Sequence, residues 1–336
     1  MRCVVIERPG VVRVEERPAP TLEPHQVKVR VSACGVCGTD VHIFHGGFRA
    51  DYPVVPGHEF AGVVEEAGAC VTHVRPGDRV TVDPNISCGV CPYCRRGAVH
   101  LCRRLTAIGV NLPGGFQEIC ALPAKQVYQL PGHLPLDEAA FAEPLACCLH
   151  GIDRGGVAPG DQVVVLGAGP IGLLMTQLAR LAGAAKVIVS ELSPRKRELA
   201  QQLGADVVVD PLAEDLDARV TAVTEIGADV VFECVGTAQT AAAAVAAARR
   251  GGRVVLFGVS PKEAAMEVRP YEVFLNELTL VGSYINPHTH ARAIALLAAG
   301  RVRVRDLISH RVPLEEFPRA VELAGQKETV KVLVVP

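Results

Sequence analysis

Short runs of alternating apolar and polar residues, separated by turn residues, make up much of the first 150 positions. Residues 27–31 (VKVRV) alternate strictly, and looser versions of the pattern recur at 59–64, 78–82 and 116–122. A period of two is typical of strands with one buried face, and the Pro-Gly, Gly-Asp and Gly-Gly pairs between the runs favour turns. The pattern predicts a β-barrel-like module with little helix.

A different pattern begins near residue 150. The run 162–166 (QVVVL), apolar after its first residue, leads into a glycine-rich turn and a helical stretch, and strands and helices continue to alternate to about residue 285. Such alternation predicts βαβ units and a parallel sheet. We expect strands at 162–166, 186–190, 206–209, 229–233 and 253–257, and helices at 171–182, 195–203 and 238–248.

The alternation stops at about residue 286, where a helix is expected at 289–299 and a closing strand at 331–335. We therefore predict an α/β fold with two domains. The first is a β-barrel-like domain formed by 1–149 and 286–336, and the second is a doubly wound α/β domain at 150–285. A length of 336 residues suits two domains.

The charge balance argues against a nucleic acid or an anionic membrane as the main partner, because 34 Lys and Arg face 36 Asp and Glu. The N-terminus reaches Glu7 after four apolar residues, too few for a signal peptide. The longest apolar stretch, 163–175, is broken by three glycines and a proline and is a poor membrane span. We expect a cytoplasmic protein whose twelve cysteines are thiols or metal ligands rather than disulfides.

Four of the cysteines form one motif, Cys88, Cys91, Cys94 and Cys102, with the spacing C-x2-C-x2-C-x7-C. Closed structural zinc sites take four thiolates in a tetrahedron, and short C-x2-C turns bring two sulfurs to one ion. Four free thiols in a loop would be prone to oxidation. A nucleic-acid zinc knuckle is supported only by the neighbouring arginines. The motif predicts a structural zinc.

A second potential metal site combines three kinds of ligand. Cys37 lies in GVCGTDVH (35–42), and His58 and Glu59 lie in PGHE (56–59). A thiolate, an imidazole and a carboxylate together suit a catalytic zinc. Cys34 precedes Cys37 with C-x2-C spacing, so spacing alone also allows a second cysteine-rich site.

Taken in order along the chain, these motifs closely resemble those of the zinc-dependent medium-chain dehydrogenases, and within them the sorbitol (polyol) and threonine dehydrogenase branch. The resemblance covers essentially the whole chain. It implies a GroES-like catalytic domain, a Rossmann domain, two zinc ions per chain (one catalytic, one structural), and a homodimer or homotetramer. The resembling segments are GVCGTDVH (35–42), PGHEFAGVV (56–64), the four-cysteine motif, AEPLAC (142–147) and GAGPIG (167–172).

The resemblance also implies a ligand set for the catalytic zinc. Cys37 and His58 would bind the ion, and Glu143, Glu59 or both would supply a carboxylate. Glu59 is counted among the catalytic residues as well. Asp40 would accept the other imidazole proton of His58 and so fix its tautomer.

Two further residues are implied in proton transfer. An alcohol hydroxyl loses its proton with difficulty at neutral pH, and a zinc ion eases this step as a Lewis acid. By resemblance, Thr39 would take that proton and His42 would be the outer member of the relay, although an ordinary loop histidine is the alternative for His42.

Candidates to line the substrate pocket are Phe44, His45, Phe48, Leu112, Ile285 and Asn286.

The cofactor site is predicted from GAGPIG, a GxGxxG motif that follows an apolar strand and opens a helix. Its glycines make the turn, admit the pyrophosphate and pack the helix on the strand, while the helix N-terminus favours phosphate charge. Glu191 lies 19 residues after Gly172, where a carboxylate would hold the adenosine ribose and disfavour a 2′-phosphate. NAD is therefore expected, with NADP possible because Arg195, Lys196 and Arg197 follow. The cofactor-binding residues expected are Gly167, Gly169, Ile171, Gly172, Glu191, Lys196, Phe257, Gly258 and Val259.

We therefore predict a zinc- and NAD-dependent dehydrogenase that oxidises a secondary alcohol of a polyol or sugar-like substrate to a ketone. An L-threonine or butanediol dehydrogenase is the alternative among enzymes. A non-catalytic NADPH-binding or redox-sensing relative is the alternative of another class, and the intact metal set, Thr39 and the glycine motif argue against it. The expected partner is a small-molecule alcohol, with no nucleic acid and no membrane.

Overall fold

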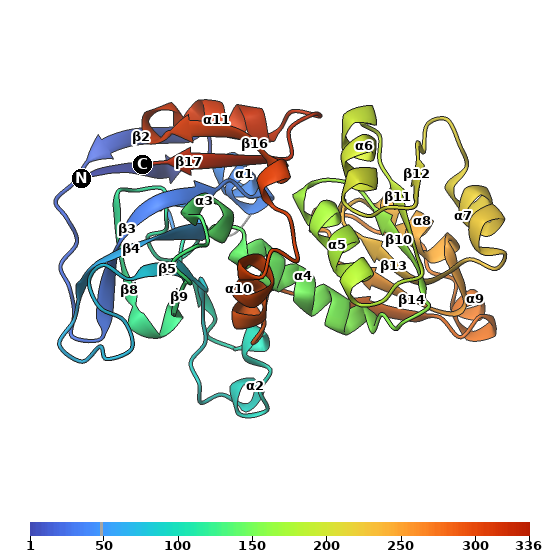
Figure 1. Cartoon of the computed structure of the whole chain (residues 1–336), viewed down its shortest axis with the longest axis horizontal. Helices are drawn as coiled ribbons and strands as arrows, with labels where there is room; N and C mark the ends of the chain where they lie inside the picture. The colour runs from blue at the N-terminus through green and yellow to red at the C-terminus, as the bar shows by residue number, and fades with distance from the viewer. Residues whose placement is uncertain (48–49) are drawn as a thin grey trace. The chain divides into compact units, whose positions relative to one another are not determined.

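The computed structural model describes residues 1–47 and 50–336, so Phe48, a candidate for the substrate pocket, lies outside the described residues. The chain divides into two compact units (Figure 1). Unit 1 consists of Met1–Ala146 and Pro287–Pro336, and unit 2 consists of Cys147–Asn286. Within the described ranges, no helix combines the length and apolar character needed to cross a membrane.

Unit 1 is built on a seven-stranded sheet in the order β16-β17-β3-β4-β5-β9, with β8 paired to β3. The pairs are antiparallel except β16 with β17. In β3 the buried Val27, Val29 and Val31 alternate with the more exposed Lys28 and Arg30, which is the pattern read from the sequence. The strands of the unit are β1 (Arg2–Arg8), β2 (Val11–Glu16), β3 (Gln26–Gly35), β4 (Glu59–Ala67), β5 (Arg79–Val82), β6 (Asn85–Ile86), β7 (Thr106–Ala107), β8 (Ile119–Pro123), β9 (Val127–Gln129), β16 (Ile308–Pro313) and β17 (Lys331–Val335).

Unit 1 also contains helices, of which α11 lies at 317–324, where the sequence pattern predicts none. Its helices are short, and a helix of two turns shows few repeats of its period. In the eight-residue α11, for example, Phe317, Ala320 and Val321 are buried, and the Phe317 ring packs 4.8 Å from that of Phe116. The helices are α1 (Gly38–His45), α2 (Pro92–Arg95), α3 (Leu136–Ala139), α4 (Ala142–Gly155, which runs on into unit 2), α10 (His290–Ala298) and α11 (Phe317–Ala324), with 3-10 turns η1 (Val99–Leu101), η2 (Ala124–Gln126), η3 (Arg305–Leu307) and η4 (Leu314–Glu316).

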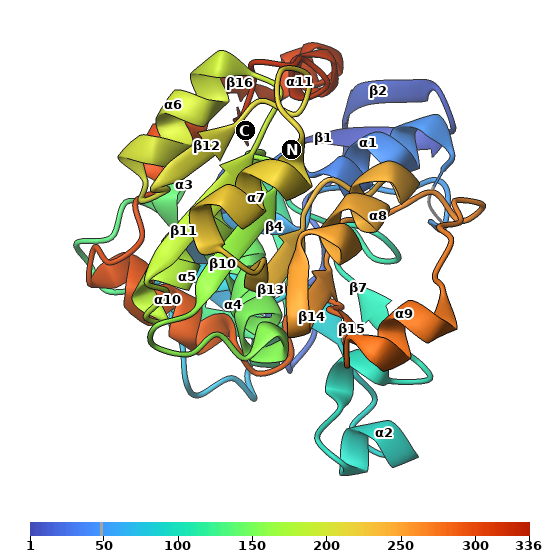
Figure 2. The ribbon, with the colours of Figure 1, turned by 90° about the vertical axis from the view of Figure 1, so that its right-hand side faces the viewer.

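Unit 2 is a six-stranded parallel sheet in the order β12-β11-β10-β13-β14-β15, and Figure 2 shows these strands side by side. The order reverses between β10 and β13, and in doubly wound sheets dinucleotides bind at the carboxyl ends of the two strands flanking that point. The strands are β10 (Gln162–Leu166), β11 (Lys186–Ser190), β12 (Val207–Val209), β13 (Ala228–Glu233), β14 (Ala248–Leu256) and β15 (Thr279–Gly282).

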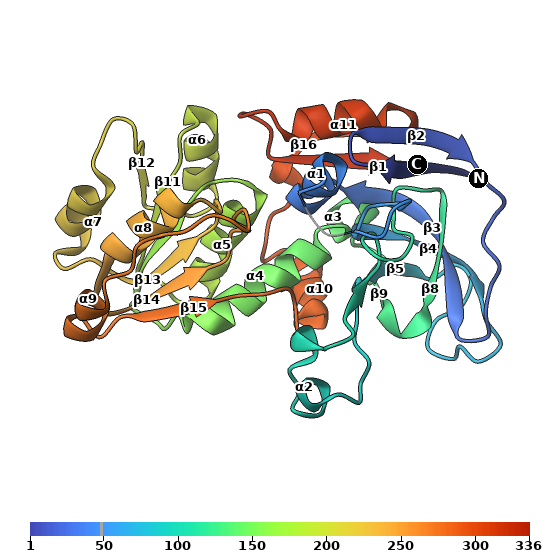
Figure 3. The same ribbon diagram turned by 180° about the vertical axis from the view of Figure 1, so that it is seen from behind.

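Helices cover both faces of this sheet, as right-handed crossovers require. In Figure 1 α5 and α6 lie in front of the sheet, and in Figure 3, seen from behind, α7 and α8 lie in front. The alanine-rich helix ends at Ala246 rather than at 248, because Ala228 already pairs with Ala248 at the start of β14. The helices are α5 (Pro170–Leu181), α6 (Pro194–Gln202), α7 (Leu216–Thr224), α8 (Ala238–Ala246) and α9 (Pro270–Leu275).

His290, the first residue of α10, is buried without polar partners. Its side chain is 1% exposed, and among the described residues neither ring nitrogen has a hydrogen-bond partner. The ring packs 4.7 Å from that of Tyr128. Burial disfavours the imidazolium form and lowers the pKa of His290 from 6.5 to about 3.

We expect this histidine to make unit 1 sensitive to acid. Between about pH 3 and pH 6.5, His290 is protonated in the unfolded chain but not in the folded chain. The free energy of unfolding is therefore unaffected by His290 above pH 6.5 and falls as the pH drops below that value. The loss is about 2 kcal/mol by pH 5. Thermal melts from pH 7 to pH 5 should therefore show a shallower decline for His290→Phe than for wild type. The exposed His133 supplies the control, and an equal effect of His133→Phe would contradict the assignment.

Candidate metal centres and nucleotide site

The four-cysteine motif forms a lobe around α2, which projects from the strands of unit 1 (Figure 1). The four Sγ atoms lie within 4.8 Å of one another. Sγ of Cys94 is 3.5 Å from that of Cys91 and 4.0 Å from that of Cys88. In a tetrahedron with Zn–S bonds of about 2.3 Å the sulfurs lie about 3.8 Å apart. The spacing of the sulfurs therefore fits a zinc ion.

The backbone of the lobe favours thiolates. The N–H groups of Val90 and Cys91 lower the pKa of the Cys88 thiol to about 6. The N–H groups of Cys88 and Arg104 each donate to Cys102 Sγ at 3.3 Å. Because zinc binds the deprotonated sulfur, these contacts prepare the lobe for the metal.

The second cluster brings together Cys37, His58 and Glu59, whose ligand atoms also lie within 4.8 Å of one another. Cys37 immediately precedes α1, and Glu59 opens β4. His58 and Glu59 are buried, while Cys37 is partly exposed. Cys34 is fully buried in the core of unit 1 and is not part of the cluster.

Asp40 ties the two segments of this cluster together. It is completely buried in α1; its Oδ2 accepts the Cys37 N–H at 2.8 Å, and its Oδ1 accepts the Gly57 N–H at 3.2 Å. The same Oδ1 lies 3.6 Å from Nδ1 of His58, a buried nitrogen with no hydrogen bond among the described residues. Burial alone lowers the pKa of His58, but Asp40 and Cys37 more than offset this and raise it well above 6.5. A thiolate and carboxylates around a buried imidazole form a donor set that fits zinc.

Glu59 is held by a buried lysine. Lys331, the first residue of β17, places Nζ 2.6 Å from Glu59 Oε2 and 3.2 Å from the Val36 carbonyl. The side chains of Lys331 and Glu59 are only 3% and 2% exposed. A Cβ atom at Gly35 would lie 2.2 Å from Glu59 Oε2, so the absence of a side chain at Gly35 is what leaves room for the carboxylate.

The remaining predicted residues of this centre are Thr39 and His42, which lie close to Cys37 in the sequence, and Glu143, which lies at the start of α4. Thr39 and His42 are on α1; Thr39 is half-buried and His42 is exposed. Glu143 is buried in the first turn of α4 but is not part of the group formed by Cys37, His58 and Glu59.

The glycine motif follows β10 and opens α5, as the sequence pattern predicts. A Cβ at Gly172 would meet the Gly167 carbonyl oxygen at 1.8 Å, so only glycine allows this close packing of helix on turn. A Cβ at Gly169 would meet no atom within 4 Å, which leaves open space beside the N-terminus of the twelve-residue α5. The turn thus offers room and helix-end charge for a phosphate group.

Glu191 joins the end of β11 to this turn. Its Oε2 accepts the Ala168 N–H at 2.7 Å, and its Oε1 accepts the Ser193 N–H at 2.8 Å. Arg197 pairs with Asp210 at 3.0 Å and therefore stabilises the unit, whereas Arg195 is exposed. Lys196 is partly buried in the first turn of α6.

The third predicted cofactor segment, 257–259, follows β14. The N–H groups of Phe257 and Gly258 both donate to the Glu233 carbonyl oxygen, at 3.0 and 2.8 Å. Val259 is 63% exposed. Just beyond β15, Ile285 has a φ of +45°, a backbone conformation that costs a β-branched residue free energy.

The comparisons with known proteins agree with this geometry. Residues 23–132 match the alcohol dehydrogenase GroES-like domain, and residues 170–299 match the zinc-binding dehydrogenase family. The chain is 33% identical over 340 residues to D-arabinitol dehydrogenase 1 of Uromyces fabae, covering 100% of this chain and 97% of that protein. The chain belongs to the zinc-dependent medium-chain dehydrogenases.

Two further relatives place it within that family. Sorbitol dehydrogenase of Gallus gallus is 33% identical, with 99% of this chain and 95% of that protein covered. A structure described as a zinc-binding dehydrogenase from Sinorhizobium meliloti 1021 bound to NADP is 45% identical with a TM-score of 0.96, covering 100% of this chain and 99% of that one. The family, its sorbitol-like branch and the fold predicted from the motifs are therefore confirmed. Zinc and a nicotinamide nucleotide are the cofactors of this medium-chain dehydrogenase.

Sequence reasoning missed two residues of the dehydrogenase's sites. Lys331 begins the apolar run KVLVV, where a lysine is usually an exposed strand end, and its partner Glu59 is 272 residues away. Glu233 ends β13, the strand that pairs with β10 on the side away from β11, and the sequence pattern marks it only as part of a strand. The signal that could have found them is a charged residue at the end of a mainly apolar strand. Charged residues are rarely buried without a partner, so such a residue indicates a partner elsewhere in the fold.

Proposed function

We propose that the chain oxidises a secondary alcohol of a polyol or sugar-like substrate and transfers the hydride to NAD, giving a ketone. The observation that carries the proposal is the cluster of the partly exposed Cys37 with the buried His58 and Glu59, which fits zinc and lies close in sequence to Thr39 on α1. The relatives from Uromyces fabae and Gallus gallus, which are polyol dehydrogenases by name, support the substrate class.

In this proposal Cys37, His58 and a carboxylate of Glu59, of Glu143 or of both hold the catalytic zinc. Asp40 receives no proton in the reaction; it fixes the tautomer and the orientation of His58, because its carboxylate faces Nδ1 and is itself held by two backbone N–H groups. Zinc, when bound, supplies the Lewis acidity that lowers the pKa of a coordinated hydroxyl.

The proton of the alcohol is removed by residues of α1. Thr39 Oγ1 accepts it while the threonine hydroxyl gives up its own proton toward His42, which is exposed and passes a proton on to solvent, so Thr39 ends the step neutral. Both residues project from one short helix whose N-terminus is fixed by Asp40, so the relay and the metal ligand Cys37 share a rigid support.

The direct test is a panel of sorbitol, arabinitol, L-threonine and 2,3-butanediol with NAD or NADP, followed by absorbance of the reduced nucleotide. We expect the polyols to be oxidised with the highest kcat/KM. A clear preference for threonine or butanediol would replace the proposed substrate class, and no oxidation of any alcohol by zinc-loaded protein would overturn the dehydrogenase proposal.

NAD rather than NADP is proposed because Glu191 directly follows β11, at the position where a carboxylate binds the adenosine ribose and repels a 2′-phosphate. The relative from Sinorhizobium meliloti was solved with NADP, and the exposed Arg195 lies four residues after Glu191. The ratio of kcat/KM for the two nucleotides in the same panel decides the preference, and a wild-type preference for NADP would refute this assignment of Glu191.

Two zinc ions per chain are proposed, the second in the four-cysteine lobe. Replacing Cys94 by Ser leaves an incomplete tetrahedron in a lobe whose helical turns α2 and η1 bury no residue, so we expect the loss of one zinc and a lower melting temperature. Metal content by mass spectrometry and thermal melting check this. Cys70→Ser, an exposed thiol outside the lobe, is the matched control. Unchanged zinc content in Cys94→Ser would refute the structural site.

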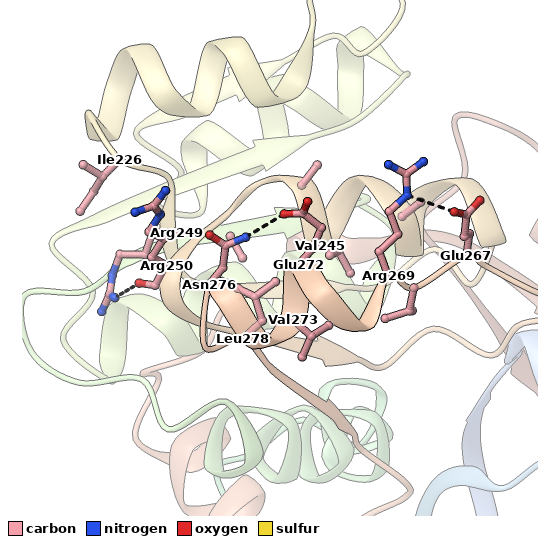
Figure 4. A pocket seen from close by; sticks show the side chains of 14 residues that line it. Ile226, Val245, Arg249, Arg250, Glu267, Arg269, Glu272, Val273, Asn276 and Leu278 are labelled. Carbon is pink, nitrogen blue, oxygen red and sulfur yellow. Dashed lines mark hydrogen bonds and ion pairs between the residues drawn. The ribbon is translucent and has the colours of Figure 1, made fainter.

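A homo-oligomer and a cytoplasmic location complete the proposal. Unit 2 carries a groove of about 560 Å³ between α8, the start of β14 and α9, and Figure 4 shows Arg250, Glu272 and Asn276 among its lining. On α9 itself, Tyr271 and Phe274 are 67% and 78% exposed, which marks an apolar surface suited to a second copy. Light scattering after size exclusion tests the assembly, and a monomer would refute it.

The cytoplasmic location is proposed because a reducing compartment suits the thiolate ligands.

A further inference from the structure

Glu233 is a buried carboxylate that no step of the proposed reaction uses. It is the last residue of β13, one of the two strands at which the sheet order reverses, and it is 1% exposed. Its Oε1 accepts three hydrogen bonds, from the Val235 and Gly236 N–H groups at 2.8 and 2.9 Å and from Thr240 Oγ1 at 2.8 Å. The carboxylate thus fixes the turn that leads into α8.

The same residue also fixes the segment after β14. Its carbonyl oxygen accepts both N–H groups of 257–258. A Cβ at Gly258 would lie 2.3 Å from the Gly236 nitrogen and 2.8 Å from Glu233 Oε2, and a Cβ at Gly236 would lie 2.6 Å from the Val259 carbonyl oxygen. The two turns therefore lie in direct contact, and Glu233 bonds to both.

The turn after β13 in addition contacts the glycine motif. The Cys234 N–H donates to the Leu166 carbonyl at 3.0 Å, and a Cβ at Gly167 would lie 2.8 Å from Val235 Cγ2. Three turns, at 167–172, 234–237 and 257–259, consequently lie in contact at the carboxyl edge of β10, β13 and β14, and Glu233 holds two of them, one through its carboxylate and one through its carbonyl oxygen.

We propose that Glu233 is a positioning residue for the nicotinamide half of the cofactor. A dinucleotide lies across the point where the strand order reverses, with one half on each side. Glu191, on the β11 side, marks the adenosine half, so the turns that Glu233 holds on the β13 and β14 side face the nicotinamide half. The inference rests on the proposed function, because it requires a nicotinamide dinucleotide in this unit.

The test compares NAD with ADP-ribose, which lacks the nicotinamide, by titration calorimetry of the zinc-loaded protein. Glu233→Gln keeps the size of the side chain but removes the charge that three donors share. We expect the Kd for NAD to rise about tenfold while the Kd for ADP-ribose changes less than twofold. Thr240→Val removes one donor only and should shift the ratio of the two Kd values in the same direction by less.

Asp229→Asn is the matched control, because Asp229 lies at the opposite end of the same strand, where it accepts the Gln162 N–H and pairs with Arg249. Asp229→Asn should lower the melting temperature and leave the ratio of the Kd for NAD to the Kd for ADP-ribose unchanged. If Glu233→Gln changes both Kd values equally or neither, the inference is wrong although the proposed function stands. A wild-type protein that binds neither NAD nor NADP overturns both.

Discussion

Replacing Thr39 by Val should slow alcohol oxidation by about 10²–10⁴-fold, the range expected when a general acid–base group is lost. Valine keeps the branched shape of the half-buried side chain, so α1 and the placement of Cys37 and Asp40 should survive. Zinc content and nucleotide affinity should therefore stay at wild-type values. The deficit should shrink at high pH, where hydroxide from solvent removes the alcohol proton directly.

Thr39→Ser supplies the matched control, because it restores the hydroxyl without the methyl group and should recover most of the rate. His42→Ala should show a milder form of the same pH dependence. Rates are to be measured under conditions where a deuterium isotope effect shows that hydride transfer limits turnover. Wild-type turnover by Thr39→Val at neutral pH, with zinc content verified, would remove Thr39 from the mechanism.

Replacing Lys331 by Met should lower the free energy of unfolding by about 3–5 kcal/mol, because it leaves the Glu59 carboxylate buried without its partner. The effect is measured by chemical denaturation of zinc-free protein, so that the metal does not compensate for the missing charge. The double variant Lys331→Met with Glu59→Gln should recover much of the loss, since no uncompensated charge is then buried.

Lys28→Met is the control for this prediction. Lys28 pairs with Glu66 at 2.7 Å, but Glu66 is 53% exposed, and exposed pairs contribute about 0–1 kcal/mol. Equal stability of Lys331→Met and Lys28→Met would show that the Lys331–Glu59 pair does not hold the strands of unit 1 together.

The parts of the fold that the sequence predicts best are those with long, regular patterns. The apolar run before the glycine motif is β10, and the helix after it is α5, because both elements bury continuous apolar surface against their neighbours. The strictly alternating run 27–31 lies in β3 for the same reason. The pattern fails in unit 1 where elements are short: α1 and α11 have eight residues each and rely on tertiary packing.

The residues of the candidate site also fall into two groups, those that local sequence patterns predict and those that depend on contacts across the fold. Cys37, His58 and the four-cysteine motif are local in sequence, and the structure brings each set within 4.8 Å. Contacts made across the fold are not visible in one sequence: Lys331 reaches Glu59 because β17 pairs with β3, and β3 pairs with β4.

The central claim, that polyol oxidation occurs at zinc held by Cys37 and His58, is tested most directly by measuring metal content and NAD-linked sorbitol oxidation on one preparation of Cys37→Ser. The account predicts one zinc per chain instead of two, a lobe that keeps its metal, and a loss of nearly all activity with an unchanged Kd for NAD. A Cys37→Ser protein that oxidises sorbitol at the wild-type rate, with only the lobe zinc present, would contradict it.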